Sequence, residues 1–251
     1  IASVSVLMTA VLLLTQSRGG LIAFSVTVLL MLLVAVRKSR WLVGVLIAGM
    51  VVAAVAIAYV GPGQILQAAF GPAVNADSAL SLNTLEGRVE LWSRAIYGIQ
   101  DFPFTGMGMN TFRRVVHVLY PLFLVGPDVD IGHAHNEFLQ AALDLGIPGL
   151  IAFIALYLGA FWMLFKVWQR LGGSSSQSAI SHQQSAIALG LGGGLLAHML
   201  YGLTDAVALG AKPGVLFWML LGLIAGLYQQ SHNEPSVARA PDLPKTATRP
   251  N

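Results

Sequence analysis

The chain has 251 residues, of which 56% are hydrophobic and only 10% are charged. This composition excludes an ordinary water-soluble domain and predicts an all-α integral membrane protein. The absence of cysteine excludes disulfides, thiol nucleophiles and zinc–thiolate sites, and a net charge of +3 is too small to indicate a nucleic-acid partner.

Apolar runs long enough to form membrane-spanning helices recur along the chain. Six are predicted, at residues 1–14, 21–36, 41–60, 147–165, 187–203 and 215–228. The polar segment 61–146 is too long for a simple connection, so we expect it to carry function. The predicted architecture is therefore about six transmembrane helices with a large, partly helical loop. Its divisions are three helices in 1–60, the loop in 61–146, three helices in 147–228 and a disordered tail in 229–251.

Basic residues in the short connections predict the orientation of the chain. They follow the second, fourth and sixth apolar runs, as Arg37, Lys38, Arg40, Lys166, Arg170, Arg239, Lys245 and Arg249. The positive-inside rule places them in the cytoplasm and leaves the 61–146 loop extracytoplasmic, in a multi-pass membrane protein. Asp205 and Lys212 then form an outward polar turn with a minor chance of touching substrate. Because the chain begins within an apolar run, at Ile1, we interpret it as the C-terminal part of a longer protein.

A helix with one mixed apolar and basic face is predicted inside the loop. Asn83-Thr84-Leu85-Glu86 is typical of a capping box at its start, and Phe102-Pro103 ends it. Residues at helical spacing share a face, namely Arg88, Trp92, Ala95 and Ile99, while Glu90 and Arg94 are four apart and can pair. Two interpretations remain open. Trp92 and Arg88 contact lipid headgroups and phosphate, or the helix lies on the bilayer with no catalytic role.

The end of the loop brings two imidazoles and an amide to the start of an apolar helix, in Ile131-Gly-His133-Ala-His135-Asn136-Glu137. Gly146 followed by Pro148 is predicted to stop this helix. His135 would lie at a helix N-terminus, where the peptide dipoles disfavour imidazolium, so a neutral ring able to act as a general base is expected. The alternative is that both histidines merely anchor a turn. We select His133 and Asn136 as candidate substrate-binding residues.

Arginine is frequent on the predicted outer face, at positions 18, 88, 94, 113 and 114. Arg18 lies in Ser17-Arg18-Gly19-Gly20 at the outer end of a span, where a guanidinium is costly unless it is paired or reaches the interface by snorkelling. Because arginine binds phosphate oxygens bidentately, this distribution favours a diphosphate ligand.

Asp128 and Asp130, just before His133 and His135, offer a candidate metal site. The same Asp-x-Asp pair is typical of glycosyltransferases that use nucleotide sugars. Nucleotide sugars are cytoplasmic whereas this loop is predicted to be outside, so we expect no metal.

Three groups of residues together resemble the O-antigen ligase/polymerase superfamily, over roughly residues 15–160. They are Ser17-Arg18-Gly19-Gly20, then Gly87-Arg88-x-x-x-Trp92 with Asp101-x-Pro103-x-x-Gly106-x-Gly108-x-Asn110-x-Phe112, and finally His135-Asn136-x-x-Leu139-Gln140. The resemblance implies a membrane glycosyltransferase that moves a glycan from undecaprenyl diphosphate to an acceptor hydroxyl, without nucleotide, metal or other cofactor. It also implies that Arg18 and Arg88 hold the diphosphate and that His135 deprotonates the acceptor for an inverting displacement.

Several functions remain open after this resemblance. Ligation to a lipid core, polymerisation of repeat units and transfer to protein share the motifs, so the acceptor is a glycan, lipid or protein hydroxyl. A polysaccharide flippase or transporter is the alternative from another class. Transporters place ionisable groups within their spans, whereas here the charges gather in the loop.

Overall fold

The computed structural model describes residues 2–15, 17–36, 41, 43–44, 85–173, 179–207 and 214–233. These residues form helices and no strand, which confirms the predicted all-α class. The helices are α1 (Ala2–Leu14), α2 (Arg18–Val36), α5 (Leu85–Asp101), α6 (Thr111–Leu119), α7 (Glu137–Gly173), α8 (Ala179–Gly202) and α9 (Gly214–Asn233). Asn83, Thr84, most of the predicted span 41–60, Lys212 and the tail beyond Asn233 lie outside the described residues.

Four of the helices, α2, α7, α8 and α9, are long and apolar enough to cross a membrane. They correspond to four of the six predicted spans. The first predicted span is the shorter helix α1, of 13 residues. The last helix continues past Tyr228, its predicted end, as far as Asn233. The chain is therefore a multi-pass membrane protein in which four of the described helices have the length and composition of a span.

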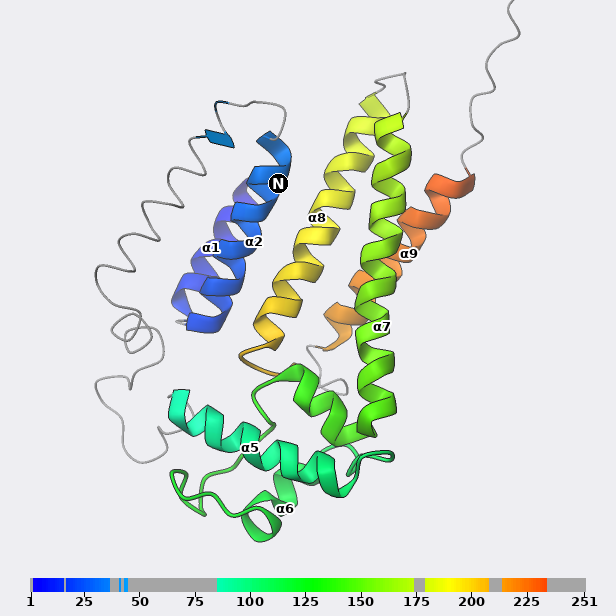
Figure 1. The fold of residues 1–251 in the computed structure, drawn as a ribbon. Helices are drawn as coiled ribbons and strands as arrows, with labels where there is room; N and C mark the ends of the chain where they lie inside the picture. The colour runs from blue at the N-terminus through cyan, green and yellow to red at the C-terminus, as the bar shows by residue number, and fades with distance from the viewer. Residues whose placement is uncertain are drawn as a thin grey trace, which may run out of the picture.

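The long helices pack side by side into a bundle (Figure 1). α7, α8 and α9 contact one another, and α2 packs on α8. Their shared core is largely aromatic and aliphatic, with buried Phe153, Tyr157, Leu195, Phe217 and Ile224. Apolar side chains also point out of the bundle, among them Ile151, Leu158 and Trp162 of α7. Such an outward apolar surface suits lipid and not water.

α5 and α6 lie across one end of the bundle (Figure 1) and have a core of their own. It contains buried Leu91, Ala95, Phe112, Val116 and Leu143. Glu90 and Arg94 pair as predicted, with 3.5 Å between Oε1 and Nη2. The face that the sequence suggested for the bilayer is turned into the protein instead, because Ala95 is buried and Ile99 packs beside it. The bilayer-surface interpretation of this face is therefore wrong.

The stop predicted at Gly146 takes the form of a kink within α7, because Gly146 has the non-helical φ of 71° and Pro148 follows inside the helix. Backbone groups freed at this kink bond to the loop that follows α5. The N–H groups of Met107 and Gly108 donate to the carbonyls of Leu143 and Asp144, at 2.6 and 3.2 Å. The kink thus joins the α5–α6 unit to the bundle.

Candidate functional site

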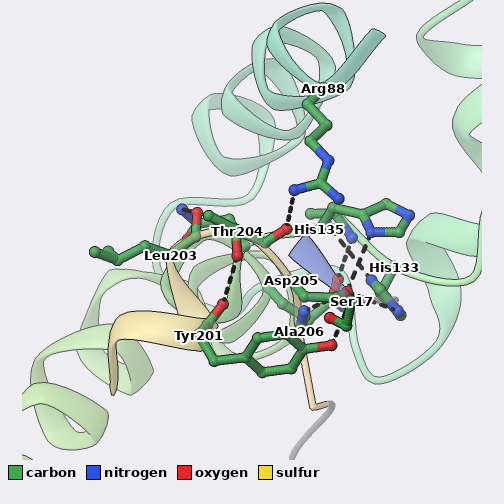
Figure 2. A network of polar contacts seen from close by, with 12 residues as sticks. Ser17, Arg88, His133, His135, Tyr201, Leu203, Thr204, Asp205 and Ala206 are labelled. Atoms are coloured by element: carbon green, nitrogen blue, oxygen red, sulfur yellow. Dashed lines mark hydrogen bonds and ion pairs between the residues drawn. The ribbon is translucent and has the colours of Figure 1, made fainter. Parts of the chain in front are cut away.

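The centre of the site is a contact between His135, which immediately precedes α7, and Asp205, in the turn after α8 (Figure 2). Nδ1 of His135 lies 3.1 Å from Oδ1 of Asp205. An ionised carboxylate can only accept, so Nδ1 of His135 carries the proton and donates it. Nε2 of His135 is then the ring atom that can accept a proton.

Asp205 is itself held from several sides. The Tyr201 hydroxyl donates to Oδ2 at 2.7 Å, and the Ala206 backbone N–H donates to Oδ1 at 2.9 Å. Burial by itself would raise the pKa of the Asp205 carboxyl, but the hydrogen bonds from His135, Tyr201 and Ala206 outweigh it and hold that pKa well below its ordinary value. Asp205 is therefore a carboxylate at neutral pH.

His133 lies beside His135, with 4.4 Å between the ring centroids, and its Nε2 is 3.6 Å from Oδ1 of Asp205. Its Nδ1 accepts the backbone N–H of His135 at 3.2 Å, which puts the ring proton of the neutral form on Nε2, toward the carboxylate. Burial, followed by the proximity of His135, lowers the pKa of His133, although Asp205 acts in the opposite direction. His133 is accordingly neutral near pH 7.

His133, His135 and Asp205 offer three potential metal-ligand atoms within 4.8 Å of one another. A cation on Nε2 of His133 would need the ring proton on Nδ1, where the His135 N–H already points. This hydrogen bonding fits proton transfer better than metal ligation. The predicted carboxylates are elsewhere, since Asp130 pairs with Arg113 of α6 and Asp128 is exposed.

Arg88 and Trp92 reach the site from consecutive turns of α5. The Arg88 guanidinium donates from Nη1 to the Thr204 carbonyl at 2.5 Å, beside the two imidazoles (Figure 2). The Trp92 indole N–H donates to the carbonyl of His135 at 3.3 Å. Arg88 and Trp92 are four residues apart and were predicted to share one face of the helix. This spacing brings both side chains to the His135–Asp205 site.

Asn136 uses both ends of its amide. Oδ1 accepts the backbone N–H groups of Phe138 and Leu139, each at 3.0 Å, which makes Asn136 the N-cap of α7. Nδ2 donates to the carbonyl of Leu203 at 3.1 Å. Asn136 therefore ties the start of α7 to the turn after α8, and a contact with substrate stays a prediction.

Arg18 is exposed at the first residue of α2, and its neighbours contact the end of α8 and the turn after it. Ser17 hydrogen-bonds to the Tyr201 hydroxyl. Gly19 lies so close to Thr204 that an added Cβ would come within 2.4 Å of the threonine Oγ1. The glycine after Arg18 thus permits the close approach that brings this helix end to the site.

Two further polar residues belong to the site: Tyr201, which the sequence reasoning missed, and Asp205, to which it gave only a minor chance of touching substrate. A signal existed, because an aspartate at the end of an apolar run is expensive to bury without partners. Tyr201 lies four residues before Asp205, which is the spacing that lets the two side chains meet at a helix end. Neither observation reveals that the partner is His135.

A second polar cluster lies between α7 and α8. One of its members, Glu137, is two residues after His135 in the chain. Glu137 is only 2% exposed, and its Oε2 accepts from the Tyr157 hydroxyl at 3.5 Å. The same hydroxyl is 2.7 Å from Nδ1 of His198, to which the sequence assigned no role. Ionisable groups therefore lie inside the bundle as well as in the loop.

Comparison with known proteins matches the part of the chain that contains Arg18, Arg88 and His135. A family model described as O-Antigen ligase matches residues 3–154. The exopolysaccharide production protein ExoQ of Rhizobium meliloti (strain 1021) is 31% identical over 119 residues, which are 46% of this chain and 25% of that protein. The match thus spans about a quarter of the curated relative. The family model includes Arg18, Arg88 and His135, whereas Asp205 lies beyond it.

Proposed function

The chain belongs to the O-antigen ligase family, and from this membership and the geometry of the site we propose that it is a membrane glycosyltransferase. It transfers a glycan from undecaprenyl diphosphate to an acceptor hydroxyl, on the extracytoplasmic face of the bacterial inner membrane. The observation that carries the proposal is the His135–Asp205 contact beside the guanidinium of Arg88.

His135 is the general base of the proposed reaction. As the acceptor oxygen attacks the anomeric carbon, its proton passes to Nε2 of His135, and Asp205 stabilises the imidazolium through Nδ1. The bond from the anomeric carbon to the diphosphate oxygen breaks, and its electron pair leaves with the diphosphate. Attack opposite to the leaving group inverts the anomeric centre. No nucleotide or metal is needed for this balance.

Arg88 and Arg18 are proposed to bind the diphosphate. Charge grows on the leaving group as its bond breaks, and fixed guanidinium groups lower the barrier by stabilising that charge. Arg88 is oriented by the Thr204 carbonyl, and its helix also carries Trp92, which bonds to the backbone of His135. α5 therefore carries the phosphate-binding Arg88 and, through Trp92, also positions the general base His135. His133 and Trp92 complete the proposed substrate-binding residues.

The acceptor is the open part of the proposal. The name of the relative, an exopolysaccharide production protein, supports a role in making polysaccharide, with a glycan hydroxyl as acceptor. Lipid and protein hydroxyls remain alternatives that share the same chemistry. Analysis of a deletion strain separates them, because shortened chains indicate polymerisation, whereas full chains accumulating on the carrier lipid indicate ligation.

Transport of a lipid-linked glycan is a second candidate function, favoured by the Glu137–Tyr157–His198 cluster inside the bundle. The two functions differ in whether a covalent product forms. Purified full-length protein should transfer glycan from purified undecaprenyl-diphosphate donor in excess EDTA, and the His135→Ala variant should not. Transfer that requires an added metal ion would refute the mechanism, and a glycan that only changes leaflet would assign transport.

A further inference from the structure

The turn between α5 and α6 exposes aromatic side chains at the level of the kink in α7. Phe104 is 79% exposed and Phe102 is 42% exposed. The whole segment 102–109, Phe-Pro-Phe-Thr-Gly-Met-Gly-Met, carries no charge. Asp101, the charged residue just before it, accepts a hydrogen bond from the Tyr120 hydroxyl at 2.7 Å. The turn is thus an uncharged aromatic projection.

This projection is held rigidly against α7. The Ile147 N–H donates to the Pro103 carbonyl at 2.7 Å. Gly146 approaches so closely that an added Cβ would lie 2.7 Å from the carbonyl carbon and oxygen of Phe104. Gly106 makes a similar approach to the Asp144 backbone from the other side. The exposed position of the aromatic rings is therefore fixed by the backbone.

Several backbone groups of the turn form hydrogen bonds within the protein. The N–H of Phe102 donates to Gly98, and the Phe102 carbonyl accepts from Gly106. Pro103 has no N–H, and its carbonyl is bonded to Ile147. Because an unsatisfied backbone group costs roughly several kcal/mol in hydrocarbon, these hydrogen bonds remove part of the cost of placing the turn there.

The exposed rings continue the outward apolar surface of α7. Leu145, Ile147 and Ile151 are exposed around and beyond the kink, and Leu158, farther along the span, is 65% exposed. Ile147 is the residue that bonds to Pro103, so the turn meets this surface where it begins. One apolar surface therefore runs from the turn onto the membrane-spanning helix.

We propose that the Phe102–Thr105 turn inserts into the acyl-chain region of the leaflet that adjoins the site. Phenylalanine side chains transfer favourably into hydrocarbon, and the absence of charge in residues 102–109 removes the main penalty for insertion. Since the turn directly follows α5, insertion fixes the height of Arg88 and Trp92 relative to the membrane surface. The inference requires only that α7 crosses the membrane, so it does not depend on the proposed transfer reaction.

Site-directed spin labelling tests the proposal, and the chain has no cysteine to interfere. Three single-cysteine variants of the full chain, labelled with a nitroxide in phospholipid nanodiscs, provide the comparison: Phe104→Cys, Leu158→Cys as the lipid-facing control and Asp128→Cys as the exposed polar control. Collision rates with oxygen, which concentrates in lipid, and with a water-soluble nickel chelate report the environment of each label.

The label at position 104 should resemble that at 158, with a severalfold higher ratio of oxygen to nickel collisions than at 128. A ratio equal to that at 128 would place the turn in water and overturn the proposal. Low accessibility to both reagents would mean that protein covers the turn, which overturns it as well. A second label, at Phe102→Cys, guards against a local effect of the first substitution.

Discussion

His135 and Asp205 are 70 residues apart in the chain, yet Nδ1 of the first lies 3.1 Å from Oδ1 of the second. The contact exists because α7 begins just after His135, α8 ends just before Asp205, and the two helices pack together. Bundle packing therefore sets the tautomer of the proposed base. Any change that shifts α8 along α7 should alter activity before it abolishes the fold.

Asp205→Asn should reduce the transfer rate by about 10²- to 10⁴-fold, the usual contribution of a positioned general base. The amide loses the charge that stabilises the imidazolium, and its NH2 can face Nδ1 of His135, which moves the ring proton to Nε2. Initial rates with purified donor measure the effect. The matched control is Asp128→Asn, an exposed acid in the loop between α6 and α7, which should keep full activity. Equal rates for the two variants would remove Asp205 from the mechanism.

Arg88→Lys should lower transfer by roughly 10- to 100-fold, the range expected for losing one charge-assisted hydrogen bond. Lysine keeps the positive charge but cannot bond to the Thr204 carbonyl and a phosphate oxygen with one planar group. Arg88→Ala should abolish transfer while the protein remains in the membrane, as measured by immunoblot of membrane fractions. Arg113→Lys is the control, since Arg113 forms an exposed pair with Asp130. An unchanged rate in Arg88→Lys would contradict a bidentate role.

Acid should destabilise the folded protein through His133. Burial lowers the pKa of His133 from its ordinary 6.5, so the unfolded chain binds the proton more readily. The stabilisation is complete above pH 6.5 and is lost as the pH falls below it. Asp205, whose pKa is also lowered, loses its contribution only below its ordinary 3.8. As the pH falls below 6.5, the midpoint of thermal unfolding in detergent should therefore drop more steeply for the unchanged protein than for His133→Asn. The same slope in both proteins would exclude His133 as the cause.

Local signals account for what the sequence predicted correctly. Apolar runs, the Phe102-Pro103 stop and the Gly146–Pro148 stop depend on neighbouring residues alone. Both stops and the apolar runs within the described residues appear where expected. The spacing of Arg88 and Trp92 likewise placed both on one face. What spacing could not give was the direction of that face, because burial of Ala95 depends on α6 and α7.

Long-range packing accounts for what was missed. Asp128 and Asp130 are near His133 in the chain, so they were the expected acidic partners. Asp130 instead forms an ion pair with Arg113 of α6. Asp205 replaces them from a different helix end. The contacts of Glu137 and His198 could not be predicted for the same reason. Their common partner, Tyr157, is 20 residues from Glu137 and 41 residues from His198.

The contact between the α5–α6 unit and α7 should depend on one glycine. Gly146 has φ 71°, a conformation that other residues adopt only with strain, and an added Cβ would lie 2.7 Å from the Phe104 carbonyl. Gly146→Ala should therefore cost about 2 kcal/mol or more and lower the midpoint of thermal unfolding.

Gly159→Ala is the matched control on the same helix, because a Cβ built there meets no described residue within 4 Å apart from the backbone of its own helix. Alanine is favoured over glycine in a helix by about 1 kcal/mol, so this variant should unfold at the same or a higher temperature. If both variants shifted the midpoint equally, the kink at Gly146 would have no special role. If only Gly146→Ala also lost transfer activity, the loss would indicate that the kink keeps α5, and with it Arg88, in register with His135.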